Sequence, residues 1–127
     1  MKIYTDGGSR GNPGKAACAF LVVKDDKIIK EFSKFLGTKT NNEAEYNAII
    51  NALEQVKAKE LEIISDSELV IRQLKGEYSI NKPHLKELYA QAMSLAKGRI
   101  IKFSNAKREN KFISRADELV NQELDNN

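Results

Sequence analysis

The amino-acid sequence predicts an α/β fold, in which a five-stranded mixed sheet has helices on both faces. The first three apolar runs are joined by connections too short for a crossover helix, so we expect three antiparallel strands. The next apolar run is reached through a helical segment, which indicates a crossover to strands that pair in parallel. A chain of 127 residues is long enough for one domain with a substantial core, and we expect a single domain over residues 1–127.

The composition is typical of a globular protein and excludes a disordered one. Hydrophobic residues make up 41% of the chain and charged residues 31%. The net charge of +3 suits a polyanionic partner, although it is weak support by itself. No signal peptide or membrane-spanning run is evident, so we expect a cytoplasmic protein that does not contact membrane. The single cysteine, Cys18, lies in an apolar run and is expected to be a buried thiol.

The first half of the chain reads as an antiparallel meander. The second strand is apolar on both faces, which is typical of a central strand, whereas the third carries charges and is expected to be less buried. The expected elements are a strand at Met1–Asp6, a glycine-rich loop at Gly7–Gly14, a strand at Lys15–Lys24, a turn at Asp25–Lys27 and a strand at Ile28–Leu36.

The second half alternates helices and strands. Thr40 and Glu43 have the spacing of a capping box, which predicts a helix from Thr40 to about Lys59. The remaining expected elements are a strand at Leu61–Asp66, a short helix at Ser67–Glu77, a helix opened by Pro83, a strand at Arg99–Ser104, a basic loop at Asn105–Lys111 and a helix capped by Ser114 that runs to Leu124.

Acidic side chains from distant parts of the chain are expected to meet at one edge of the sheet. Asp6 and Asp66 each end a short apolar strand, and Glu45 and Asp117 each lie on the apolar side of a predicted helix. Carboxylates directed towards a core are costly unless they are paired or bind metal. Oxygen-rich clusters of this kind suit Mg²⁺ or Mn²⁺.

Helical spacing separates Glu45 from its neighbour Glu43. Steps of four, seven and eight residues from Glu45 reach Ile49, Ala52 and Leu53, so Glu45 faces the sheet. Glu43 lies on a more polar face of the helix, and its role in the capping box is enough to explain an acidic residue at this position. Structural explanations remain open for two of the other carboxylates: Asp66 could cap the following helix, and Asp6 could form an Asx-turn.

These motifs resemble those of type 1 ribonuclease H, and the resemblance covers nearly the whole chain. The matching segments are Tyr4–Gly14 (YTDGGSRGNPG), Thr40–Tyr46 (TNNEAEY), Ser65–Ser67 (SDS) and Ala116–Leu119 (ADEL). The overall pattern is that of compact archaeal-like or bacterial-like members. The resemblance implies a ribonuclease H-like fold and an endonuclease that cuts the RNA strand of an RNA–DNA hybrid, leaving a 5′-phosphate and a 3′-hydroxyl.

The resemblance also implies roles for individual residues. It assigns catalysis and the binding of two Mg²⁺ ions, with Mn²⁺ as an alternative, to Asp6, Glu45, Asp66 and Asp117. It assigns substrate contacts to Ser9, Asn12, Thr40, Asn41 and Asn42, with Glu68 as a weaker candidate. The expected partner is an RNA–DNA hybrid bound by a monomer, and double-stranded RNA is left open as a second substrate.

The chain departs from some relatives in three ways. The loop Asn105–Lys111 contains no histidine, and the only histidine, His84, begins a helix elsewhere. Residues 67–98 have no room for an inserted basic helix, and we expect no separate hybrid-binding domain before Met1. Binding would then depend on the basic residues Arg10, Lys107, Arg108, Lys111 and Arg115, unless these form only a solvated charged face.

Other functions fit parts of the same pattern. A non-catalytic module that binds hybrid or double-stranded RNA would not need a buried acidic cluster. A related nuclease, such as a resolvase or transposase core, would share the carboxylates, but the glycine loop and the Thr40–Asn42 segment favour the hybrid. A protein that only stores or senses a divalent ion is the third alternative.

Overall fold

The computed structural model describes all residues, Met1–Asn127, and confirms the predicted five-stranded sheet. The strands lie in the order β3-β2-β1-β4-β5. The pairs β1–β2 and β2–β3 are antiparallel, whereas β1–β4 and β4–β5 are parallel. The elements are β1 (Lys2–Gly11), β2 (Gly14–Lys24), β3 (Lys27–Lys39), α1 (Asn41–Gln55), β4 (Glu60–Ser65), α2 (Glu68–Leu74), α3 (Pro83–Ala96), β5 (Ile100–Asn105) and α4 (Lys111–Asp125).

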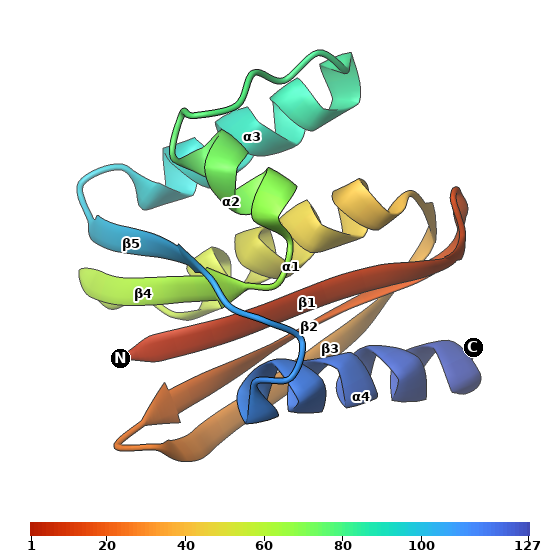
Figure 1. Cartoon of the computed structure of the whole chain (residues 1–127), viewed down its shortest axis with the longest axis horizontal. Coiled ribbons are helices and arrows are strands. Elements are labelled where there is room, and N and C mark those ends of the chain that lie inside the picture. Colours follow the sequence, from red (N-terminus) through yellow and green to blue (C-terminus); the bar gives the residue numbers. More distant parts are fainter.

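Helices cover both faces of the sheet, as the sequence predicts. Figure 1 shows α1, α2 and α3 on one side and α4 alone on the other. Successive strand residues point to opposite faces, so Ile3 and Phe20 join the core beneath α1, while Tyr4 and Leu21 join the core beneath α4. None of the helices combines the length and the apolar character needed to cross a bilayer.

The end of β1 sets the position of the acidic edge. Its parallel pairing with β4 ends at Thr5 and Ser65, so Asp6 and Asp66 each follow the last paired residue at the same edge. The antiparallel pairing of β1 with β2 continues to Gly11 and Gly14. The prediction of a loop over residues 7–14 was therefore wrong, because β2 supplies backbone partners along most of this segment.

The first turn of α1 packs against the backbone of β1 at Gly7. A Cβ atom at this position would lie 2.3 Å from the carbonyl carbon and oxygen of Ala44 and 2.5 Å from the nitrogen of Glu45. Only glycine allows this approach without displacing the helix. The contact places Glu45 directly beside the end of the parallel sheet.

The helix α1 ends earlier than predicted, at Gln55 and not near Lys59. The guanidinium of Arg99 donates to the carbonyl oxygens of Leu53 at 3.1 Å and Ala58 at 3.0 Å, and it also donates to that of Val56. These bonds satisfy carbonyls that a helix leaves unpaired at its C-terminus. The chain can therefore leave the helix and enter β4.

The cap of α4 also differs from the prediction. Asn110, and not Ser114, is the N-cap, and its side-chain oxygen accepts from the backbone N–H groups of Phe112 at 2.9 Å and Ile113 at 3.2 Å. Asparagine is as good an N-cap as serine, so the sequence alone did not distinguish the two residues. Ser114 lies within the first turn and donates to the carbonyl of Arg108 at 3.0 Å.

Two adjacent glycines test the close approach of α1 to β1. We expect Gly7→Ala to destabilise the protein by about 1–3 kcal/mol or more, because its Cβ would overlap helix backbone that cannot move alone. Gly8→Ala is the matched control, since its Cβ would meet only the Cγ1 atom of Val120, at 3.7 Å. Urea unfolding of both variants measures the difference, and equal stabilities would contradict this account.

Candidate active site

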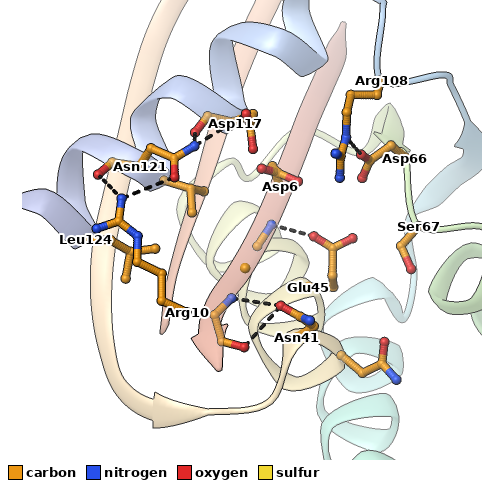
Figure 2. Close-up of a pocket in the computed structure, with 15 residues that line it drawn as sticks. Asp6, Arg10, Asn41, Glu45, Asp66, Ser67, Arg108, Asp117, Asn121 and Leu124 are labelled. Atoms are coloured by element: carbon orange, nitrogen blue, oxygen red, sulfur yellow. Dashed lines mark hydrogen bonds and ion pairs between the residues drawn. The ribbon is translucent and has the colours of Figure 1, made fainter. Parts of the chain in front are cut away.

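A largely polar hollow of about 400 Å³ opens at the edge where β1 and β4 diverge. All four carboxylates proposed from the sequence line it: Asp6, Glu45, Asp66 and Asp117. Figure 2 shows them approaching from β1, from α1, from the residue after β4 and from α4. The edge of the sheet therefore gathers side chains from segments that are far apart in the sequence.

Three of these carboxylates form a close cluster. Oxygen atoms of Asp6, Glu45 and Asp66 all lie within 4.8 Å of one another. Asp6 and Glu45 are each only 7% exposed, whereas Asp66 is less deeply buried. A cluster of hard oxygen donors fits a divalent cation such as Mg²⁺ or Mn²⁺.

Asp117 lies at the rim of this cluster. It projects from α4 towards Asp6 in Figure 2, and it is not one of the three residues whose oxygens lie within the shared 4.8 Å limit. Its helix neighbours Ile113, Val120 and Leu124 are buried, so the predicted apolar stripe is confirmed. The Asp117 side chain itself is half-buried, because it extends past the edge of that stripe into the hollow.

Hydrogen bonds from both sides hold the carboxylate of Glu45. The backbone N–H of Gly7 donates to its Oε1 atom, and the hydroxyl of Ser65 donates to its Oε2 atom at 3.2 Å. These donors offset part of the cost of burying an acidic side chain. Glu45 therefore has one orientation, set by the strand on each side of it.

Burial and mutual repulsion keep protons on this cluster. Burial raises the pKa of Asp6 to about 8, with the charges of Asp66 and Asp117 adding to the effect and that of Arg108 opposing it. Burial also raises the pKa of Glu45, and Asp6 and Asp66 raise it further. A bound cation would favour the charged carboxylates and release these protons.

The residues proposed to contact substrate join the β1–β2 hairpin to the start of α1. The backbone N–H and the hydroxyl of Ser9 both donate to Oδ1 of Asn41, at 2.8 and 3.1 Å. The N–H of Asn41 donates in turn to Oδ1 of Asn12 at 3.0 Å. Ser9, Asn41 and Asn42 line the hollow, whereas Asn12 and Thr40 do not.

Glu43 has the capping role predicted for it. Its carboxylate accepts from the backbone N–H of Thr40 at 2.9 Å, and its own N–H donates to the hydroxyl of Thr40 at 3.2 Å. Burial works to raise the pKa of Glu43, but the bonds from Thr40 outweigh it and the pKa is lowered. Glu43 does not line the hollow, and neither does Glu68, which pairs with Arg72 at 2.9 Å.

An arginine approaches the site from the loop that has no histidine. Nε of Arg108 lies 3.6 Å from Oδ2 of Asp66, and the Arg108 side chain is 81% exposed. His84 is exposed near the start of α3 and does not line the hollow. A permanent cation therefore stands at this side of the carboxylate cluster.

Comparison with known proteins identifies the family. A model of RNase H matches residues 1–125. The chain belongs to the RNase H family. It is 39% identical over 130 residues to ribonuclease HI of Halobacterium salinarum, in an alignment that covers 96% of this chain and 63% of that protein. It is also 39% identical over 99 residues to the bifunctional protein Rv2228c of Mycobacterium tuberculosis, in an alignment that covers 74% of this chain and 27% of that protein.

Solved structures confirm the ribonuclease H-like fold predicted for this chain. The crystal structure of LC11-RNase H1 in complex with an RNA/DNA hybrid superimposes with a TM-score of 0.90 at 38% identity, covering 98% of this chain and 96% of that one. The present chain thus matches nearly all of that protein, although it spans less than two thirds of the Halobacterium and Mycobacterium relatives.

Several features of this candidate site did not follow from the sequence. The sequence predicts a loop at Gly7, and the hydrogen bond from its N–H to Glu45 depends on the packing of α1. Asn121 is not among the residues predicted from the sequence, although it lies four residues after Asp117 on the same face of α4 and contacts it in Figure 2. Helical spacing could have identified Asn121, whereas only the tertiary structure places Arg10 beside it.

The raised pKa of Asp6 predicts how stability depends on pH. The ordinary value is 3.8 and the folded value about 8, so the folded protein binds this proton more tightly than the unfolded chain. The resulting stabilisation is present at low pH and is lost as the pH rises towards 8. In chelator, the melting temperature of Asp6→Asn should exceed that of the unmodified protein by a margin that widens from about pH 5 to about pH 9. A margin independent of pH would show that Asp6 is not protonated in the fold.

Proposed function

We propose that residues 1–127 form one ribonuclease H domain that hydrolyses the RNA strand of RNA–DNA hybrids, leaving 5′-phosphate and 3′-hydroxyl ends. The observation that carries the proposal is the meeting of Asp6, Glu45 and Asp66 at one edge of an RNase H sheet. A relative of the same fold has been crystallised with an RNA/DNA hybrid, which supports this substrate. A buried acidic cluster is costly, and a module that only bound nucleic acid would not need it.

In this proposal Asp6, Glu45, Asp66 and Asp117 would hold two Mg²⁺ ions, or Mn²⁺ in their place. Such ions supply Lewis acidity for the attacking water and for the leaving oxygen. Asp6 and Glu45 would release their protons on binding such ions, because cations oppose the effect of burial on their pKa values. Gly7 and Ser65 keep the Glu45 carboxylate directed at the cluster throughout.

The hybrid would lie across the hollow against the start of α1. Ser9, Asn41 and Asn42 present polar groups there, and Asn12 and Thr40 hold the backbone that carries them. A shallow minor groove exposes the 2′-hydroxyl groups that distinguish RNA from DNA. These short polar side chains, close to glycine backbone, suit contact with such hydroxyls.

Of the basic residues predicted to bind the hybrid, Lys107 and Arg108 in the loop before α4 have the positive charges most available for phosphate. Arg115 is paired with Glu31 at 2.7 Å and Lys111 with Asp26 at 3.1 Å. Lys107 has no ion pair, and Arg108 meets only Asp66, at the mouth of the site. We therefore assign the phosphate contacts of this domain chiefly to Lys107 and Arg108.

The proposal further assigns the domain to the cytoplasm as a monomer. Double-stranded RNA is a second substrate to test beside the hybrid, because its shallow minor groove also exposes 2′-hydroxyl groups. A protein that only senses or stores a divalent ion would bind metal and cleave neither duplex. A labelled hybrid and a labelled RNA duplex of equal sequence, compared in one assay, distinguish these functions.

Metal dependence is the direct test of the mechanism. Cleavage of a labelled RNA–DNA hybrid should require Mg²⁺ or Mn²⁺ and stop when a chelator is added, because the water and the leaving group both depend on the ions. Asp6→Asn, Asp66→Asn and Asp117→Asn should each lose most of the turnover while remaining folded. Cleavage that persisted in excess chelator would exclude this mechanism.

The two neighbouring glutamates of α1 provide a matched comparison. Glu45→Gln should lower turnover by orders of magnitude, because it removes a charge from the buried cluster while conserving shape. Glu43→Gln should keep near-normal cleavage at a stability cost on the order of 1 kcal/mol or less, because glutamine also serves in a capping box. Turnover numbers and thermal melts of both variants give the answer. An inactive Glu43→Gln beside an active Glu45→Gln would reverse the assignment.

A further inference from the structure

Asp117 is the one carboxylate of the site that stands apart from the close cluster, and a neighbour on its own helix holds it. Nδ2 of Asn121 donates to Oδ2 of Asp117 at 3.4 Å and to its backbone carbonyl at 3.0 Å. Figure 2 shows this amide on the side of Asp117 away from Asp66. One oxygen of Asp117 is thus occupied by a neutral donor, and the carboxylate remains beside Asp6.

The orientation of the Asn121 amide is itself fixed from the β1–β2 hairpin. Nη2 of Arg10 donates to Oδ1 of Asn121 at 3.4 Å and to its backbone carbonyl at 3.5 Å. Because Arg10 can only donate, it requires the amide oxygen to face it, which leaves the NH₂ group to face Asp117. The alternative amide orientation would place two donors against each other and two acceptors against each other.

The charge of Arg10 is paired with Asp125 and not with Asp117. Nη2 of Arg10 lies 2.7 Å from Oδ1 of Asp125, one turn beyond Asn121 on α4. The guanidinium is therefore paired outside the cluster and reaches Asp117 only through the amide. A direct ion pair with Asp117 would compete with a metal ion for that carboxylate, whereas a neutral amide does not.

We propose that Asn121, oriented by Arg10, is the positioning residue for Asp117. It keeps a half-buried side chain at the rim of the site from turning into solvent, so that the carboxylate is already in place when a divalent ion binds. The inference rests on the proposed metal-binding role of Asp117, and it assigns to Asn121 no contact with substrate or metal.

Replacement of Asn121 by leucine tests this role, because leucine has a similar shape and no donor. Asn121→Leu should raise the Mg²⁺ concentration for half-maximal cleavage roughly ten-fold, the lower end of the usual cost of removing a hydrogen-bond partner of a metal ligand. The KM for hybrid should be unchanged, and high Mg²⁺ should restore most of the activity. Calorimetric titration of the hybrid-free protein with Mn²⁺ should show the same loss of affinity without reference to activity.

Two further variants make the outcome decisive. Gln122→Leu is the matched control, since Gln122 is exposed on the same helix and contacts no carboxylate of the site. It should leave metal dependence unchanged, and its metal-free melting temperature should match that of Asn121→Leu. Asp117→Asn should abolish the metal response that Asn121→Leu weakens.

Two alternative results would contradict the positioning role of Asn121, and a third would contradict the metal-binding role of Asp117. Normal Mn²⁺ affinity and Mg²⁺ dependence in Asn121→Leu, with both lost in Asp117→Asn, would overturn the positioning role and leave the active site intact. An increased KM for hybrid with unaltered metal dependence would make Asn121 a substrate contact and would also overturn it. Unaltered metal dependence in Asp117→Asn would instead remove Asp117 from the proposed site.

Discussion

The contact between Gly7 of β1 and the first turn of α1 is the constraint on which the rest of the site depends. The absence of a side chain at Gly7 lets the helix backbone approach within a distance that any Cβ atom would prevent. At the same point the N–H of Gly7 donates to the carboxylate of Glu45. Gly7 thus allows the close approach of α1 and also donates a hydrogen bond to the Glu45 carboxylate, which explains how Glu45 can be almost fully buried.

The acidic cluster lowers the stability of the fold when no cation is bound. Burial and repulsion raise the pKa values of Asp6 and Glu45, so in the absence of cations the fold retains protons that an exposed carboxylate would lose. The two apolar cores, one on each face of the sheet, supply the stabilisation that offsets this cost. The cost is confined to one edge, where the strands stop pairing and a ligand can enter.

Arginines stand on opposite sides of the carboxylates and act differently. Arg108 is largely exposed and meets Asp66 directly, so it is free to exchange that contact for a phosphate. Arg10 is paired with Asp125 and reaches Asp117 only through the amide of Asn121. The charge of Arg108 is therefore available to a ligand at the loop side of the site, whereas the charge of Arg10 at the α4 side is already paired within the protein.

The sequence by itself determined the number of strands in the sheet, which of them run antiparallel or parallel, and the elements that carry the four carboxylates. Short connections, helical spacing and the capping box at Thr40 are local features, and local features identified Glu45 over Glu43 because one turn of helix separates a buried face from a polar one. The sequence predicts a loop over the glycine-rich segment, whereas pairing with β2 makes most of it part of β1. Only the tertiary structure decided that Asp117 lies at the rim, that Arg10 contacts its helix neighbour Asn121, and that Arg108 faces Asp66. These facts depend on how α4 and its preceding loop lie against a sheet edge built by β1 and β4, which are distant in the chain, and no local pattern encodes such a distance.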